Sequence, residues 1–278
     1  MASFKFNFSN TKEISETKDD TDMAWLSSEE IIPSNQIQDL DDLVIHARMF
    51  TCDEVEIGHV LVNNMACAKE TGLKNLIELS EKEHSDLVAG KYEGGLKIWE
   101  CTYDLIEYFE KYPGEINFKD AKVLDLGCGA GILGIYAFLK KAFVTFQDYN
   151  KEILEYCTIP NVLLNIEEEE REKEIRCKFY SGDWMSFDKL LDKSEVFDII
   201  LTSETIYNQQ NYDKLISLFL NRLSDKGTVF VGAKTYYFGV GGGTRQFEAS
   251  IENTNLKSEV VMKTSSGIQR EILKINKS

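Results

Sequence analysis

Three glycines stand close together after a short apolar run, and an acidic residue precedes them. The letters LDLGCGAG (residues 124–131) place Asp125 before Gly127, Gly129 and Gly131. Glycines at this spacing let the backbone turn sharply and approach a ligand closely. With an expected strand before the loop and an expected helix after it, the pattern predicts a ligand site beyond the carboxyl end of that strand.

Two classes of cofactor compete for this loop. Gly129, Gly131 and Gly134 match the dinucleotide fingerprint, which serves a pyrophosphate. The carboxylate of Asp125 would repel a pyrophosphate, and it favours a ligand with a positive end. The ammonium and sulfonium groups of S-adenosylmethionine provide such an end, so we expect this cofactor over a nicotinamide dinucleotide.

Acidic residues also follow the next two expected strands. Asp148 lies 23 residues after Asp125 and can accept both hydroxyls of a ribose. Asp183 follows Gly182 where an adenine would lie, and it can accept from the exocyclic amine while Trp184 stacks on or walls the pocket. Each acid alone could be a turn or cap residue. Three acids at three strand ends, together with the glycine loop, favour an adenosylmethionine pocket.

The hydrophobic pattern from residue 95 onward alternates strands with helices. This predicts an α/β, Rossmann-like, seven-stranded and mostly parallel sheet with helices on both faces. The last two strands follow each other without a long helix, which predicts one antiparallel strand. Asn150 is expected to cap one helix, and Pro160 to interrupt it, with Thr158 capping a further turn. The strands are expected at residues 123–126, 142–148, 176–180, 196–202, 227–233, 256–263 and 268–276, and the helices at 98–112, 132–139 and 211–224.

The first third of the chain differs in composition. Residues 1–90 hold 7 basic and 18 acidic residues, so they carry most of the net charge of −16. We expect residues 1–35 to be a disordered acidic tail, residues 36–90 an N-terminal extension or cap, and residues 91–278 the cofactor-binding domain. The acidic surface disfavours direct nucleic-acid binding and suits a basic partner protein, or it keeps a flexible tail soluble.

Cysteine and histidine usage gives no sign of a metal site. The six cysteines show no C-x-x-C spacing and there are three histidines, so neither zinc nor a disulfide framework is expected. The chain shows no signal peptide and no apolar run long enough to span a bilayer. We therefore expect no membrane association, a location in the cytoplasm and nucleus, and a monomer.

Three further segments carry a more specific resemblance. They read YEGGLKIWECT (residues 92–102), DIILTSETIYN (198–208) and GVGGGTRQF (239–247). Together they resemble the eukaryotic histidine protein methyltransferase 1 family over roughly residues 85–278. By this resemblance the cofactor would be contacted by Ile98, Trp99, Glu100, Cys101, Thr102, Gly127, Gln147, Asp148, Tyr149, Gly182, Asp183, Trp184 and Ser203.

The resemblance also implies a substrate. It implies methylation of a histidine in a large-subunit ribosomal protein, at the ring nitrogen remote from the backbone, with an effect on ribosome assembly or translation. A basic ribosomal protein suits the acidic chain, and the nucleolus is one expected location. Trp99 could alternatively be a core aromatic, and the glycine run at 239–243 a flexible hairpin loop.

Related enzymes carry an acid-x-x-Tyr element after the fourth strand, and here it is Glu204 and Tyr207. A lysine with a pKa of about 10.4 is neutral about once in 2500 at pH 7, a cost of about 4.6 kcal/mol, whereas an imidazole is about three quarters neutral. A histidine enzyme therefore has to select one ring nitrogen by hydrogen-bonding the other. Glu204 or Asp198 could accept that N–H, and Tyr207 could wall the pocket or orient the ring. Asp198 could equally be a strand-start residue without a chemical role.

Two other functions remain open from the residues alone. One is a protein-lysine N-methyltransferase of the same superfamily. The other is a non-catalytic ribosome-assembly binding protein that keeps the cofactor pocket for stability. A nicotinamide oxidoreductase is disfavoured by Asp125.

Overall fold

The structure is a computed structural model, and it describes residues 26–33, 44–61, 72–83, 88, 90–166, 176–264 and 267–278. Most of the acidic tail expected at 1–35, and part of the extension expected at 36–90, lie outside these residues. The domain expected at 91–278 is described almost throughout.

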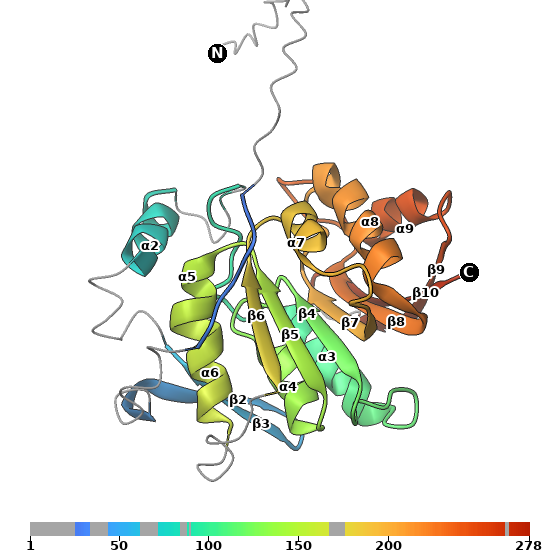
Figure 1. The fold of residues 1–278 in the computed structure, drawn as a ribbon. Coiled ribbons are helices and arrows are strands. Elements are labelled where there is room, and N and C mark those ends of the chain that lie inside the picture. Colours follow the sequence, from blue (N-terminus) through green and yellow to red (C-terminus); the bar gives the residue numbers. More distant parts are fainter. Residues whose placement is uncertain are drawn as a thin grey trace, which may run out of the picture.

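A single large sheet organises the chain, in the order β1-β6-β5-β4-β7-β8-β10-β9 (Figure 1). Seven of its strands form the expected Rossmann-like sheet, and neighbours from β6 to β8 pair in parallel. The sheet order reverses direction at β4, so the carboxyl ends of β4 and β7 border a crevice where such folds bind ligands. The seven strands are β4 (Lys122–Leu126), β5 (Phe143–Asp148), β6 (Cys177–Ser181), β7 (Phe197–Ser203), β8 (Leu223–Lys234), β9 (Leu256–Thr264) and β10 (Arg270–Lys277).

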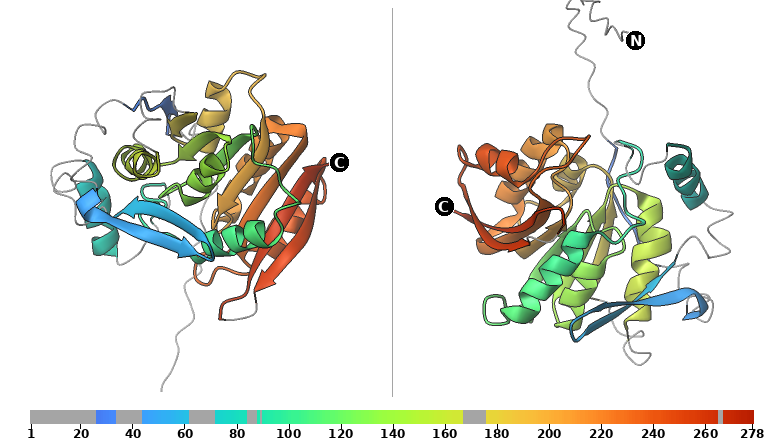
Figure 2. Two further views of the ribbon diagram at one scale, coloured as in Figure 1. Left: turned by 90° about the horizontal axis from the view of Figure 1, so that it is seen from below. Right: turned by 180° about the vertical axis from the view of Figure 1, so that it is seen from behind.

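The antiparallel member expected near the C-terminus is β10. It pairs antiparallel with both β8 and β9, and the two last strands form the edge of the sheet beside the C-terminus (Figure 2). An eighth strand was not expected. β1 (Glu29–Glu30) pairs antiparallel with β6 at the other edge, where Figure 1 shows it in blue. This short part of the first 35 residues therefore pairs with the sheet.

Helices cover both faces of the sheet. The alternation of side chains along β4 divides the core, because Val123 packs with the helices of one face and Leu124 with those of the other. The first face holds α3 (Glu100–Lys111), α4 (Ile132–Leu139) and the helical run from α5 (Lys151–Ile153) to α6 (Ile159–Leu164). The second face holds α7 (Trp184–Leu190), α8 (Tyr212–Arg222) and α9 (Thr244–Ile251). The sequence did not predict α7 and α9.

The helix after β5 runs through Pro160 without a break, which corrects the expected interruption. A π-helical turn, Leu154–Thr158, joins α5 to α6, and the wider turn accommodates the proline that cannot donate a backbone hydrogen bond. Thr158 is helical and caps nothing. Its hydroxyl donates to the carbonyl of Gly129 at 2.6 Å. Asn150 occupies the cap position, but its side chain makes no cap hydrogen bond.

A hairpin precedes the domain and packs below α6 in Figure 1. It consists of β2 (Ala47–Cys52) and β3 (Val55–Val60). The side chain of Asn161 accepts from the backbone N–H of Val60 at 2.7 Å, and that of Asn165 from Gly58 at 2.9 Å. These side chains fasten part of the expected extension to the domain. Across the described ranges, including α2 (Gly72–Glu83), none of the helices is both long and apolar enough to cross a bilayer.

Candidate active site

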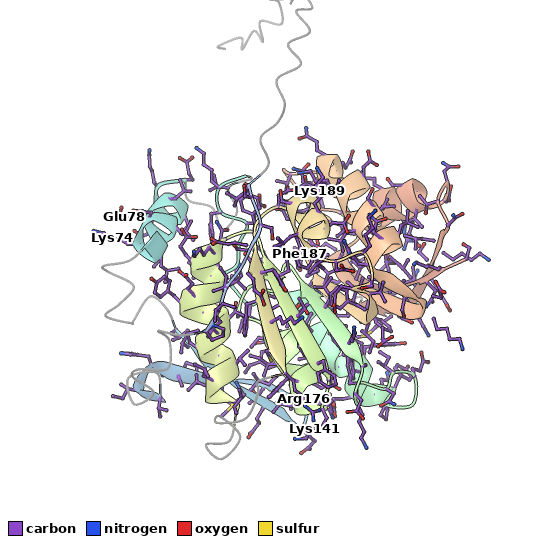
Figure 3. All side chains as sticks on the ribbon, in the orientation of Figure 1. Lys74, Glu78, Lys141, Arg176, Phe187 and Lys189 are labelled. Atoms are coloured by element: carbon purple, nitrogen blue, oxygen red, sulfur yellow. The ribbon has the colours of Figure 1, made fainter. Side chains whose placement is uncertain are left out.

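A cavity of about 770 Å³ opens at the carboxyl ends of the parallel strands. In Figure 3, Lys141 and Arg176 mark the end of the sheet where β5 and β6 begin, and Lys189 on α7 lies toward the opposite end. Loops that follow β4, β5, β6, β7 and β8 all contribute to the cavity wall. The volume falls in the range of about 300–1,000 Å³ that is usual for small-molecule sites.

The glycine loop forms the floor of the cavity beside Asp125. Gly127 and Gly129 line the cavity and have positive φ angles of 66° and 51°. Asp125 is 1% exposed, and its Oδ2 accepts from the backbone N–H of Gly134 at 2.8 Å. A Cβ on Gly134 would lie 2.2 Å from the Phe146 ring, so only glycine allows α4 to approach the strands this closely. Burial raises the pKa of Asp125 to about 8.

Asp148 lies at the end of β5 and also lines the cavity. Its Oδ2 accepts from the N–H of Gly129 at 2.9 Å, and its Oδ1 accepts from Asn150 at 3.0 Å. Burial raises the pKa of Asp148 to about 6, although these hydrogen bonds oppose the shift. A carboxylate can accept about four hydrogen bonds, so capacity remains for the hydroxyls of a ribose. Tyr149 lines the cavity next to it.

Asp183 caps a helix and also lines the cavity. It caps α7 by accepting from Met185 at 2.9 Å, and it forms an ion pair of 2.7 Å with Lys214. Trp184 lines the same end of the cavity, and so does Leu26 from the segment before β1. The N-terminal segment is therefore part of the wall at this end.

The segment before α3 closes another side. Trp99 is half-buried and lines the cavity, and its indole N–H donates to the carbonyl of Gly94 at 3.2 Å. The hydroxyl of Thr102 donates to that of Ser203 at 3.2 Å, which joins α3 to the end of β7. Ile98, Trp99, Thr102 and Ser203 thus all lie in the cavity wall. Trp99 is therefore part of the cavity wall and is not a core aromatic residue.

Glu204 is the most unusual residue of the cavity wall. It directly follows β7 with a φ of 60°, a left-handed conformation that is strained for a residue other than glycine. It is 6% exposed, and neither carboxylate oxygen accepts a hydrogen bond of standard geometry, although the Cys101 thiol and the Tyr237 hydroxyl lie close to it. The closest cation is the Nζ atom of Lys234, 3.7 Å from Oε1. Strain and unsatisfied polar atoms at one buried position are typical of a functional site.

Tyr207 lies three residues further and also lines the cavity. Its hydroxyl donates a hydrogen bond to Oε2 of Glu93. Burial raises the pKa of Glu93, which is held by a backbone hydrogen bond from Gly90 as well. Glu93, Lys234 and Tyr237 line the cavity but were not singled out from the sequence. Glu93 stands inside the segment that carried the family resemblance, and Lys234 ends a strand, so their positions offered a signal.

Five residues expected to contact the cofactor do not line the cavity. The side chain of Gln147 donates to the carbonyl of Gly182 at 2.8 Å, and Cys101 is fully buried. Glu100 is ion-paired with Lys234 at 3.6 Å. The residues that do not line the cavity are Glu100, Cys101, Gly131, Gln147 and Gly182.

The suggested catalytic role of Asp198 does not fit its position. Asp198 lies at the start of β7, whereas the cavity lies at the end of that strand. Ser203 lies five positions further along the strand, or about 16 Å away at the usual rise per residue. Its oxygens accept from the backbone N–H of Lys122 at 3.0 Å and from the Ser224 hydroxyl at 3.2 Å. The other interpretation, a strand-start residue, describes Asp198 correctly.

The glycine run after β8 forms a loop at the mouth of the cavity, and backbone hydrogen bonds hold this loop in place. Gly243 donates to the carbonyl of Ile206 at 3.2 Å, and Gly241 donates to Tyr237 at 2.9 Å. The side chains of Phe238 and Val240 in this loop line the cavity and are 79% and 57% exposed. The loop is therefore fastened to the segment that carries Glu204, in contrast to a free hairpin.

Comparisons with known proteins bear on this site. A family model described as lysine methyltransferase matches residues 74–237. The histidine protein methyltransferase 1 homologue of Bos taurus is 42% identical over 222 residues, which cover 69% of this chain and 59% of that protein. The homologue of Dictyostelium discoideum is 44% identical, with coverages of 69% and 61%. The chain thus spans about three fifths of the length of these two relatives.

Solved structures share the fold at low sequence identity. A Streptococcus mutans protein described as an S-adenosylmethionine-dependent methyltransferase has a TM-score of 0.54 at 12% identity, covering 83% of this chain and 55% of that one. A methyltransferase structure complexed with SAH has a TM-score of 0.53 at 13% identity, with coverages of 83% and 56%. These neighbours support the Rossmann-like methyltransferase fold.

The Rattus norvegicus homologue is 38% identical over 248 residues, which cover 81% of this chain and 67% of that protein. Together with the family model, this match extends across the glycine loop, Glu204 and most of the cavity wall. The chain belongs to the histidine protein methyltransferase 1 family, within the wider family of lysine methyltransferases.

Proposed function

We propose that this protein is an S-adenosylmethionine-dependent protein-histidine N-methyltransferase. Its acceptor is the ring nitrogen remote from the backbone of a histidine in a large-subunit ribosomal protein. The observation that carries the proposal is Glu204, a buried and strained carboxylate whose oxygens accept no hydrogen bond of standard geometry, in the wall of the same cavity as the glycine loop.

The cofactor assignment is supported by the charge of the cavity floor. Asp125 and Asp148 both line the cavity. The carboxylate of Asp148, with a pKa of about 6, would repel a pyrophosphate, and Asp125, with a pKa of about 8, ionises more readily beside a cationic ligand. Asp125 suits the ammonium end of the methionine portion, and Asp148 suits the ribose hydroxyls. When bound, S-adenosylmethionine supplies an activated methyl group on a sulfonium. The protein then has to orient the acceptor, and good orientation alone lowers a barrier by about 7–11 kcal/mol.

The acceptor assignment is supported by Glu204 and Tyr207. A neutral imidazole needs no base before attack, but the ring nitrogen that does not react carries a proton that requires an acceptor. The unpartnered oxygens of Glu204 suit that N–H, and the side chain of Tyr207 walls the same region.

The reacting nitrogen uses its lone pair to form the bond to the methyl carbon, while the carbon–sulfur bond breaks and its electron pair stays on sulfur. The ring becomes an imidazolium whose remaining N–H is held by the Glu204 carboxylate. The proton leaves afterwards to Glu204 or to water, so the transfer balances without another reactant. The charge of Glu204 stabilises the imidazolium as it forms.

The proposed substrate is a basic ribosomal protein. The net charge of −16 favours a basic protein partner, and electrostatic attraction would speed their encounter. Methylation in the cytoplasm or the nucleus, with an effect on ribosome assembly or translation, is consistent with such a partner. The main alternative is a lysine acceptor, since the matching family model is described as lysine methyltransferase.

The test is transfer of labelled methyl groups from S-adenosylmethionine to a ribosomal protein fraction by the wild type, Glu204→Gln and Glu204→Ala. We expect both variants to bind the cofactor with wild-type affinity in calorimetry, and to lose at least about 2 kcal/mol of transition-state stabilisation, or about thirtyfold in rate. Unchanged turnover in Glu204→Gln would remove Glu204 from the mechanism. Cofactor binding by the wild type without transfer to any protein would support a non-catalytic binding protein.

A further inference from the structure

Lys234 is a cation inside the proposed acceptor region. It is the last residue of β8 and lines the cavity, and its side chain is only 14% exposed. Its Nζ atom lies 3.6 Å from Oε2 of Glu100 and 3.7 Å from Oε1 of Glu204. The reaction described above gives this lysine no role.

Aromatic rings also hold the ammonium group of Lys234. Its Nζ atom lies over the rings of Trp99 and Tyr237, 5.4 Å and 5.7 Å from the ring centroids. Such contacts between a cation and an aromatic face are attractive, and more so away from water. Two carboxylates and two rings therefore fix a positive charge beside Glu204.

The positive charge of Lys234 affects the pKa of the neighbouring Glu100 carboxylate. The pKa of Glu100 is lowered overall. Burial opposes this shift, while the helix-start N–H of Glu100 itself and the charge of Lys234 produce it. Burial first, and then the charge of Glu204, raise the pKa of both Cys101 and Tyr237. Lys234 is thus the cation that compensates the Glu204 carboxylate in a region of little solvent.

The positive charge of Lys234 beside Glu204 affects a lysine acceptor and a histidine acceptor differently. A substrate lysine arrives as an ammonium at neutral pH, and it would need the Glu204 carboxylate that Lys234 already faces. Two like charges in a buried site repel each other strongly. An imidazole arrives mostly neutral, so it meets no such repulsion, and it can still donate its N–H to Glu204.

We propose that Lys234 is a specificity-determining residue that keeps a protonated lysine out of the acceptor site and reserves the site for a neutral histidine ring. The inference rests on the function proposed above and deepens it. It also explains how a chain in a family described by lysine methylation can select histidine.

The experiment measures which amino acid is methylated. Extract from cells lacking the protein is treated with labelled S-adenosylmethionine and each variant, the protein is hydrolysed, and methylhistidine and methyllysine are quantified. Lys234→Met keeps an unbranched side chain without the charge, and Lys234→Arg keeps the charge. We expect methylhistidine from the wild type and from Lys234→Arg. For Lys234→Met we expect the ratio of methyllysine to methylhistidine to rise at least about tenfold, equivalent to about 1.4 kcal/mol.

Lys214→Met is the matched control. It removes one positive charge from the wall of the same cavity, beside Asp183 at the β6 end of the sheet, and we expect it to leave the ratio unchanged. Calorimetry with S-adenosylmethionine checks that each variant is folded and binds the cofactor.

An unchanged ratio in Lys234→Met with normal cofactor affinity would overturn the inference and leave the proposed function intact. Loss of both products in Lys234→Met and in Lys234→Gln, with cofactor binding kept, would overturn it as well, because the lysine would then be required for transfer itself. Methyllysine as the product of the wild type would instead refute the proposed function.

Discussion

The hydroxyl of Tyr207 donates a hydrogen bond to Oε2 of Glu93, which joins the loop after β7 to the segment before α3. The other oxygen of Glu93 accepts from the backbone N–H of Gly90 at 2.6 Å. Both residues line the cavity, so this pair connects the wall that holds Glu204 to the wall that leads to Trp99. Burial raises the pKa of Glu93, and the hydrogen bond from Gly90 opposes this shift.

Tyr207→Phe should weaken the connection between the two walls. The substitution removes one hydrogen bond to a partly buried carboxylate, a loss of about 1.5–3 kcal/mol in favourable cases. We expect a lower midpoint in urea unfolding and at least a tenfold slower methyl transfer. Tyr236→Phe is the control, since Tyr236 lines the same cavity but is 45% exposed. Wild-type stability and rate in Tyr207→Phe would show that the bond has no role.

The pKa of Asp125 predicts a pH dependence of cofactor affinity. Burial raises this pKa from 3.8 to about 8. The folded protein without ligand therefore retains a proton that the unfolded chain has lost, and the associated stability is present below about pH 4 and disappears as the pH rises through about 8. A cationic ligand prefers the ionised carboxylate, so binding releases the proton. We expect the dissociation constant of S-adenosylmethionine to fall by up to about tenfold per unit between pH 6 and 7.5.

Asp125→Asn is the matched variant for this prediction. It keeps the shape of the side chain and an oxygen that can accept from Gly134, but it cannot ionise. We expect weaker binding in calorimetry and a nearly flat profile over the same range, since Asp148 titrates lower, at about 6. The same slope in Asp125→Asn and the wild type would assign the proton to another group.

Gly182→Ala tests the contact between β1 and the cavity. Gly182 has a φ of 107°, and a Cβ there would lie 2.5 Å from the carbonyl oxygen of Ser27. We expect a loss of about 1–3 kcal/mol in the free energy of unfolding and weaker cofactor binding, because Asp183 and Leu26 share this wall. Gly114→Ala is the control, because no atom lies within 4 Å of a Cβ there. Equal effects of the two substitutions would show that β1 does not depend on Gly182.

Phe238→Ser tests substrate docking at the mouth of the cavity. Phe238 is 79% exposed in the loop after β8, so its loss should cost little stability. We expect a higher KM for the protein substrate, by about fivefold or more, with kcat and cofactor affinity unchanged, because removing apolar contact area weakens association. Leu139→Ser, which removes a 41% exposed apolar side chain outside the cavity wall, should leave KM unchanged. A lower kcat with unchanged KM in Phe238→Ser would contradict a docking role.

Much of the sheet could be predicted because its strands are short apolar runs with clear ends. The acids Asp125, Asp148 and Asp183 were expected in one site because carboxyl ends of parallel strands share an edge, and all three line the cavity. The two candidate acids around β7 could not be ranked from the sequence. Their separation along the strand, with Glu204 at the cavity end, decided between them.

Other features depended on contacts between distant parts of the chain. The side chain of Asn150 looked like a helix cap, but it donates to the carbonyl of Lys91 at 2.8 Å. Lys234 became notable only through its distance to Glu204, which no local pattern reveals. β1 is two residues long and was hidden in an acidic segment, because its pairing with β6 is made by backbone groups.

Site-resolved mapping of the methyl group tests the central claim most directly. Extract from cells lacking the protein would be treated with purified wild-type protein and labelled S-adenosylmethionine, and the modified residue located by mass spectrometry. The account predicts one methyl group on the ring nitrogen of a histidine in a large-subunit ribosomal protein. A methyl group found on lysine, or no transfer although the cofactor binds, would contradict it.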